Sequence, residues 1–188
     1  MTDQQVTVGA TKGFTLPRDC VVTIIPAGHS VTLTAGHRVT LLQALGGTAT
    51  VTTSEGEMAR LSAADSIDFG FVAVAAKPDV TDDTPFSVDR VWEAAATVYD
   101  PEIPVDIVEL GLVYRVDTSE QANGAWHVDI DMSVTAPFCG MGDILRQDLH
   151  DAVAALPGVD EVDVKLVFDP PWDATRLSDV ARLELGMM

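Results

Sequence analysis

The sequence predicts an α+β fold in two parts, a small all-β module over residues 1–80 and an αββαβ two-layer domain over residues 85–188. Short alternating or β-branched segments, separated by glycine-containing turns, fill residues 20–76 and are typical of a module built from strands. Two prolines and three aspartates interrupt the apolar runs at 77–87, which indicates a linker. Helical and strand periodicities then alternate through residues 88–168, which favours two helices on one face of a small sheet.

The second domain is expected to begin with a helix. Ser87 is a predicted N-cap, and apolar residues recur at helical spacing after it. The Asp100-Pro101 pair should end this helix, because a residue before proline is pushed out of the α region. The later elements are predicted as strands at 112–117, 126–134 and 162–168 and a helix at 141–156, with a short helix closing the chain.

Composition limits the classes of partner. The 188 residues carry a formal net charge of -18, and 22 of the 29 acidic side chains follow residue 80. Such a charge repels phosphate backbones and anionic membrane surfaces, so neither nucleic acid nor membrane is an expected partner. No run approaches the roughly 20 apolar residues of a membrane span, and the first residues lack a signal-peptide pattern. A cytoplasmic location is therefore expected.

The two cysteines, Cys20 and Cys139, are too few for a disulfide scaffold. Cys139 is predicted in a loop between a core strand and a helix, where free backbone N–H groups and the helix dipole favour a thiolate. Gly140 and Gly142 would let the backbone approach a ligand closely. The local residues leave two interpretations open: a reactive or metal-binding thiol, and a small hydrophobic residue that fills the loop.

Neighbouring ligands are not obvious from the sequence. His127 and His150 are candidate bases for a cysteine nucleophile, but His127 falls on the polar face of its strand and His150 almost three helical turns along. Both are expected to be solvated. Two cysteines cannot supply a closed four-thiolate site from one chain. A bound cluster would have to be bridged between subunits of a homo-oligomer, completed by other ligands, or held transiently.

An acidic stretch, DPEIPVDIVELGLVY, occupies residues 100–114. Its carboxylates could collect on one loop and recruit a cation, or they could cap turns while the prolines stiffen the passage into the sheet. The residue chemistry favours turn capping. The residues concerned are Asp100, Glu102, Asp106 and Glu109.

This stretch, together with SVTAPFCGMGDILRQDL and VDEVDVKLVFDPPW, resembles the iron-sulfur cluster assembly domain of the SufT-type family. That family is related to the phenylacetate-pathway protein PaaD and to the eukaryotic cytosolic iron-sulfur targeting factor. The resemblance spans about residues 85–188. The first module also resembles the N-terminal extension of longer SufT-type proteins, in the RDC, IPAG and QALGG segments.

The resemblance implies a role in the maturation of iron-sulfur proteins, either by carrying a labile cluster or by bringing apoproteins to the assembly machinery. It places the family's characteristic cysteine at Cys139. Many relatives have proline after this cysteine, whereas Gly140 stands here, as in the SufT branch. The other positions that match the family's motifs are Asp100, Pro101, Glu102, Gly111, Leu112, Thr135 and Pro137.

The leading hypothesis is a non-enzymatic maturation factor in which Cys139 ligates iron or a labile iron-sulfur cluster. Client apoproteins and the assembly machinery would be its partners, and Cys20 is a candidate accessory ligand. Two alternatives stay open. In one, Cys139 is the nucleophile of a thiol enzyme and the backbone N–H groups of the 139–142 turn stabilise an oxyanion. In the other, the protein is an adaptor that binds clients through its acidic face.

Overall fold

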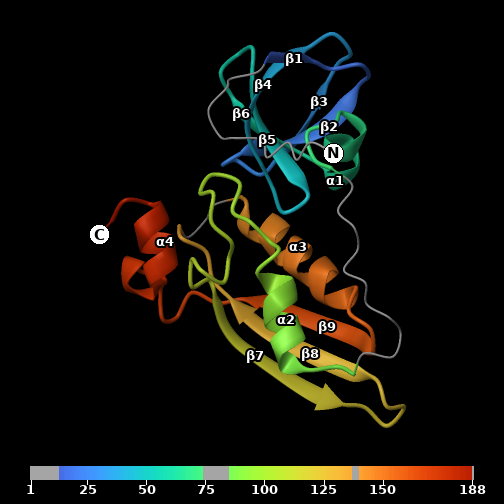
Figure 1. Cartoon of the computed structure of the whole chain (residues 1–188), viewed down its shortest axis with the longest axis vertical. Coiled ribbons are helices and arrows are strands. Elements are labelled where there is room, and N and C mark those ends of the chain that lie inside the picture. The colour runs from blue at the N-terminus through green and yellow to red at the C-terminus, as the bar shows by residue number, and fades with distance from the viewer. Residues whose placement is uncertain (1–12, 74–84, 137–139, 188) are drawn as a thin grey trace, which may run out of the picture. The chain divides into compact units, whose positions relative to one another are not determined.

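The computed structural model describes residues 13–73, 85–136 and 140–187. The predicted combination of sheets and helices is confirmed (Figure 1). The chain divides into two compact units, one containing strands β1 to β6 and helix α1, the other containing the elements from α2 onward. The boundaries 1–80 and 85–188 stay a prediction. No helix in the described part of the chain is long and apolar enough to cross a membrane.

The first unit is built on a six-stranded antiparallel sheet with the order β1-β4-β5-β6-β2-β3. Its strands are β1 (Gly13–Thr15), β2 (Cys20–Ile25), β3 (Ser30–Leu33), β4 (Arg38–Leu45), β5 (Thr48–Thr53) and β6 (Met58–Leu61). Alternate residues of these strands form a buried apolar core that includes Val22, Val51 and Leu61. Strand alternation thus places one side of each segment in a common core.

A short helix corrects the expectation of a module made only of strands. Helix α1 (Ala63–Asp68) follows β6 directly, and its N-cap Ser62 accepts a hydrogen bond from the N–H of Asp65 at 3.1 Å. Arg18 forms ion pairs with Asp65 and Asp68 at 2.8 and 2.7 Å. A serine N-cap followed by an acidic first turn is a helix-start signal, which the strand-based interpretation of this segment missed.

The second unit contains a three-stranded sheet with the order β7-β8-β9. Strands β7 and β8 pair antiparallel, whereas β8 and β9 pair parallel. Its elements are α2 (Val88–Ala95), β7 (Val113–Glu120), β8 (Trp126–Met132), α3 (Gly142–Ala154), β9 (Val159–Leu166), a 3-10 turn at Ala174–Arg176 and α4 (Asp179–Glu184). Helix α3 is therefore the crossover that a parallel strand pair requires.

Helix α2 is shorter than the apolar spacing predicts. Ser87 is its N-cap residue, but the Ser87 side chain makes no capping hydrogen bond. The helix ends at Ala95, and the Thr97 hydroxyl donates to the Ala94 carbonyl at 2.7 Å. This side-chain hydrogen bond competes with helical continuation. Phe86, just before α2, stacks on the Trp126 ring at a centroid distance of 4.6 Å.

Helices α2 and α3 cover one face of the three-stranded sheet (Figure 1). The core between them contains Val91 and Ala95 from α2 and Leu145, Leu149 and Val153 from α3. These residues pack on the inward side chains of the strands, which alternate with polar residues. The opposite face of the sheet consequently carries the polar half of each strand.

Leu149→Ala tests this core. Leu149 is 0% exposed, so truncation should lower the free energy of unfolding of the second unit by about 2–5 kcal/mol through lost burial and a cavity. Urea unfolding monitored by tryptophan fluorescence reports on the stability of the second unit, because all three tryptophans lie after residue 90. Leu183→Ala is the matched control: Leu183 is 64% exposed and should change stability by less than about 0.5 kcal/mol. Equal effects of the two substitutions would contradict the proposed packing.

Candidate functional site

The candidate site centres on the segment between β8 and α3. Cys139 and Pro137 lie outside the described residues, so the predictions about the thiol's surroundings are not tested by the structure. Thr135, which follows β8, is half-buried, whereas Gly140 is exposed. Ser133 is buried, and its N–H donates to the Leu112 carbonyl at 2.8 Å. This hydrogen bond joins the segment that precedes the cysteine to the end of the acidic stretch.

Gly142 marks a close approach between helix and sheet. A Cβ atom at this position would lie 3.2 Å from Val134 Cγ1 and 3.5 Å from Leu166 Cδ1. Met141, the N-cap residue of α3, is buried and makes no side-chain capping hydrogen bond. The small side chain of Gly142 therefore lets the start of α3 pack on the strand ends, a role distinct from the predicted close approach to a ligand.

A small cavity adjoins Thr135. Its volume is about 30 Å³, close to the space one water molecule occupies. It lies between the end of β8 and the segment that follows β9. The lining residues are Ser133, Val134, Thr135, Phe168, Pro171 and Trp172.

The acidic stretch forms a loop whose first carboxylate is inside the fold. Asp100 is 8% exposed, and its Oδ1 accepts hydrogen bonds from the N–H groups of Glu102 and Ile103 at 2.8 and 2.9 Å. Desolvation raises the pKa of Asp100 above its ordinary value, although these two hydrogen bonds act in the opposite direction. Desolvation and the nearby Asp100 also raise the pKa of Glu102. Asp100 thus organises the turn that contains Pro101.

In the second half of the loop, a second aspartate caps a turn in the same way. Asp106 Oδ1 accepts from the N–H groups of Val108 and Glu109 at 2.9 and 3.0 Å. The Glu109 carboxylate accepts from the Ser178 hydroxyl. These contacts agree with the favoured turn-capping interpretation. In the described part of the chain, the carboxylates of this loop do not converge into a group of three metal ligands.

The C-terminal segment packs against the acidic loop. Trp172 Nε1 donates to the Leu110 carbonyl at 2.8 Å, and the Arg176 guanidinium lies 3.7 Å from the centroid of the Tyr114 ring. Gly111 has a positive φ of 66°, and a Cβ there would collide with the Arg176 carbonyl oxygen. Gly111 is thus required both for its backbone conformation and for this close approach.

Sequence reasoning missed the roles of Trp172, Arg176 and Ser178. The DPPW segment was recognisable as part of a family motif, but its local pattern does not predict a hydrogen bond from Trp172 to Leu110. These contacts join residues more than 60 positions apart in the chain. Only the fold brings them together.

Cys20, the candidate accessory ligand, opens strand β2 and is 4% exposed. Desolvation raises the pKa of its thiol, which favours the neutral form. Its neighbours are apolar residues of the first unit's core. In this environment Cys20 behaves as a small hydrophobic residue.

Comparison with known proteins identifies what the second unit is similar to. The family model described as iron-sulfur cluster assembly protein matches residues 88–165. An Fe-S protein maturation auxiliary factor of Porphyromonas gingivalis is 42% identical over 92 residues, which make up 49% of this chain and 84% of that protein. The Fe-S protein maturation auxiliary factor YitW of Bacillus subtilis is 38% identical, over 53% of this chain and 93% of YitW. The Fe-S protein maturation auxiliary factor SufT of Staphylococcus aureus is 33% identical, over 48% of this chain and 98% of SufT.

Gly111→Ala should destabilise the loop. A left-handed conformation costs a non-glycine residue about 1–2 kcal/mol, and the collision with the Arg176 carbonyl adds to this cost. Gly124→Ala is the matched control, since Gly124 has φ 81° and nothing within 4 Å of its added Cβ. Chemical unfolding of both variants should show a clearly larger loss for Gly111→Ala. A loss no larger than that of Gly124→Ala would show that Arg176 does not pack against this position.

Asp100 should make stability depend on pH. Because folding raises its pKa, its protonation stabilises the fold fully below the ordinary pKa of aspartate, and this contribution is lost as the pH rises through the folded-state value. Asp100→Asn keeps the acceptor oxygen for both N–H groups without the charge, so it should be at least as stable as wild type at pH 7 and lose this pH dependence. Asp100→Ala should cost about 1–3 kcal/mol, because it leaves two backbone donors unpaired.

Urea unfolding between pH 4 and pH 8 distinguishes the roles of charge and hydrogen bonding at Asp100. An Asn variant as unstable as the Ala variant at pH 7 would show that the negative charge itself is required. An unchanged pH profile in Asp100→Asn would show that another group titrates in this range.

Proposed function

This chain belongs to the iron-sulfur cluster assembly protein family, and we propose that it matures iron-sulfur proteins by holding a labile cluster, or its iron, through Cys139. The observation that carries this proposal is the 42% identity to a maturation factor of which the match covers 84%. The cluster is cargo that passes to client apoproteins. The protein acts without catalytic turnover of its own.

The choice of Cys139 follows from the burial of Cys20. Iron binds the thiolate, and the buried Cys20 thiol is held in the neutral form within an apolar core. Cys139 is the other cysteine of the chain. It precedes α3, whose N-cap residue Met141 makes no side-chain capping hydrogen bond. The helix dipole at such a terminus supports negative charge.

One thiol gives weak and reversible ligation. Iron-sulfur clusters are commonly held by four thiolates, and in this proposal the chain contributes one, that of Cys139. The remaining ligands would come from a second copy of the chain, from the assembly machinery or from the client. Incomplete ligation suits a carrier, because a cluster held by a full set of protein ligands would be slow to leave.

The second unit is the proposed working part, with the αββαβ two-layer arrangement over residues 85–188. Thr135, Pro137, Gly140 and Gly142 flank Cys139 in the sequence of this unit. The acidic loop, fixed by Asp100, shapes the adjoining surface through the Ser133–Leu112 hydrogen bond. The strand-rich module of residues 1–80 would be an appended domain. The motif residues of this loop are Asp100, Pro101, Glu102 and Gly111.

The proposed partners are apoprotein clients and the iron-sulfur assembly machinery, met in the cytoplasm. The net charge of -18 supports binding to basic protein surfaces and opposes binding to nucleic acid or anionic membranes. A homodimer that shares one cluster through two copies of Cys139 is the simplest assembly that supplies a second thiolate.

Anaerobic reconstitution with iron and sulfide tests the ligand. Wild type should acquire visible absorption and iron, and Cys139→Ser should lose both, because the substitution removes the proposed thiolate ligand. Cys20→Ala is the matched control and should load as wild type does. Iron content per protomer, read with absorbance, gives the occupancy.

Two outcomes would reject cluster ligation by Cys139. Loading of Cys139→Ser to the wild-type level would place the ligands elsewhere. Absence of loading in every variant, together with unchanged client binding by Cys139→Ser, would favour the adaptor function. Rapid stoichiometric alkylation of Cys139 with turnover of an acyl or disulfide substrate would favour the thiol enzyme.

A further inference from the structure

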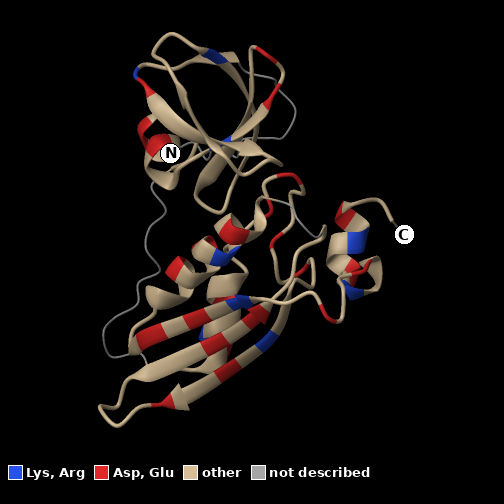
Figure 2. Ribbon diagram, turned by 180° about the vertical axis from the view of Figure 1, so that it is seen from behind, with Lys and Arg blue, Asp and Glu red and all other residues tan. Residues whose placement is uncertain are grey.

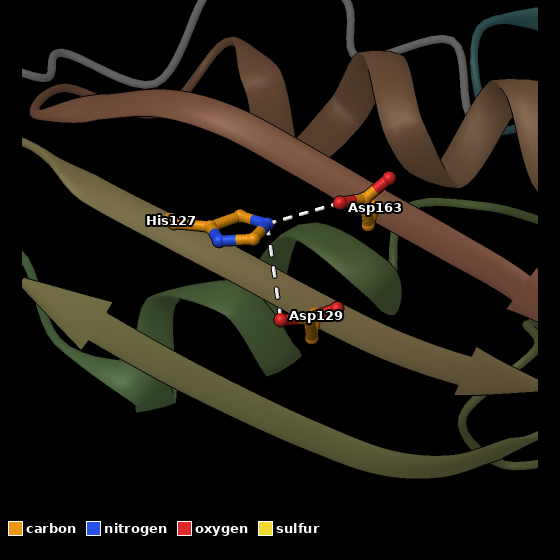
Figure 3. Close-up of side chains that lie close together, drawn as sticks. All are labelled: His127, Asp129 and Asp163. Carbon is orange, nitrogen blue, oxygen red and sulfur yellow. Dashed lines mark hydrogen bonds and ion pairs between the residues drawn. The ribbon is translucent and has the colours of Figure 1, made fainter.

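The open face of the three-stranded sheet carries an imidazole and two carboxylates that point toward one another (Figure 3). His127 Nε2 lies 3.1 Å from Asp163 Oδ2 and 3.8 Å from Asp129 Oδ2. One ligand atom from each of the three residues lies within 4.8 Å of the others. This is the one such group of histidine, cysteine and acidic residues found in the described part of the chain.

The sheet fixes the three positions. His127 and Asp129 are two residues apart on β8, so their side chains emerge on the same face. Asp163 is the direct partner of Asp129 in the parallel register between β8 and β9. All three side chains therefore project from adjacent, hydrogen-bonded strands, a more rigid support for a site than a loop.

The distances between these atoms suit a shared metal ion. Nitrogen and oxygen ligands lie about 2.0–2.2 Å from a zinc-like ion, so two ligands of one ion are about 3.0–3.5 Å apart in octahedral or tetrahedral geometry. Of the two separations between Nε2 and a carboxylate oxygen, 3.1 Å lies within this range and 3.8 Å is slightly longer. Small side-chain rotations would bring all three atoms to bonding distance.

The surrounding charge also favours a cation (Figure 2). Asp117, Asp129 and Asp163 form a row of three aspartates in register across the sheet, and like charges placed directly opposite destabilise a sheet. Two cationic side chains form ion pairs with aspartates of this row. Arg115 pairs with Asp117, and Lys165 Nζ binds Asp129 Oδ1 at 3.1 Å.

On the other side of the row the nearest partner is the His127 imidazole. Lys165 contacts Oδ1 of Asp129, whereas Oδ2 is the oxygen that faces His127. The Asp163 oxygen that contacts His127 is also Oδ2, and the Asp163 side chain is 55% exposed. Water could therefore complete the coordination of an ion held between these atoms.

We propose that His127, Asp129 and Asp163 form a binding site for a divalent first-row transition metal ion, independent of the cysteine loop. The imidazole selects ions that accept nitrogen ligands, such as zinc, iron(II) or cobalt(II), over magnesium and calcium. Lys165 is a positioning residue that holds Asp129 through its second oxygen. The site takes the ion as a mononuclear species, with three protein ligands and water.

Cobalt(II) and zinc titrations test the site. The full chain is used with any affinity tag removed and with Cys139→Ser, so that the Cys139 thiol cannot bind the metal. Calorimetry should give one site per protomer. The cobalt spectrum should lack a thiolate-to-metal charge-transfer band, and magnesium should not compete.

His127→Gln and Asp163→Asn should each weaken binding by at least about tenfold, because losing even an outer contact of a metal ligand typically costs 10–100-fold. His150→Gln is the matched control: His150 also pairs with a carboxylate, that of Asp151 at 3.0 Å, but is not part of a group of three ligands. It should bind as the parent does. Circular dichroism confirms that each variant is folded.

Absence of saturable zinc and cobalt binding in the parent would overturn the proposal and leave His127 and Asp163 as an ordinary ion pair. Equal weakening by His127→Gln and His150→Gln would also overturn it, since nonspecific surface binding would then explain the signal. Zinc-dependent shifts of the His127 imidazole NMR resonances, with His150 unaffected, would support it directly.

Discussion

The parallel pairing of β8 with β9 is the constraint on which the second unit depends. Parallel neighbours cannot be joined by a tight turn, so the chain must cross over between them, and α3 makes that crossing. The helix buries one face of the sheet through Leu145, Leu149 and Val153. The segment that contains Cys139 is the connection into this helix. The same pairing aligns Asp129 with Asp163 on the opposite face.

The acidic loop illustrates how charged residues can serve the fold. Asp100 and Asp106 each use one oxygen to satisfy two backbone N–H groups, which would otherwise be left unpaired where the loop enters the core. Trp172 and Arg176 contact this loop through a hydrogen bond to Leu110 and a cation–π contact with Tyr114. The high acidic content of this half is therefore partly structural, and the proposed cargo ligand is a thiolate.

Periodicity predicted much of the second unit. The alternation from Trp126 onward identifies β8 and its buried face, and the apolar spacing after residue 141 identifies α3. The end of α2 could not be predicted from spacing alone, because a Thr97 hydrogen bond competes with the helix. In the first unit, β1 lies outside the predicted strand range of 20–76 because its three residues are too short for a periodic signal, and α1 was not predicted.

The candidate site residues also fall into two groups, those recognisable from the sequence and those that only the fold brings together. Cys139 and the acidic motif are visible in the sequence because their neighbours form contiguous motifs. The grouping of His127 with Asp163 depends on strand register, which local pattern does not fix when both residues lie on a polar face. Sequence reasoning therefore assigned His127 to the solvent. Its strand face was predicted correctly, but its neighbour on β9 was not.

Transfer of a reconstituted cluster to an apo-ferredoxin is the most direct test of the central claim that Cys139 holds a labile cargo. The account predicts that wild type passes iron and sulfide to the acceptor in the presence of a chelator, with matching loss of its own visible absorption, and that Cys139→Ser passes none. A cluster that stays on the wild-type protein, or transfer at an equal rate from Cys139→Ser, would contradict the account.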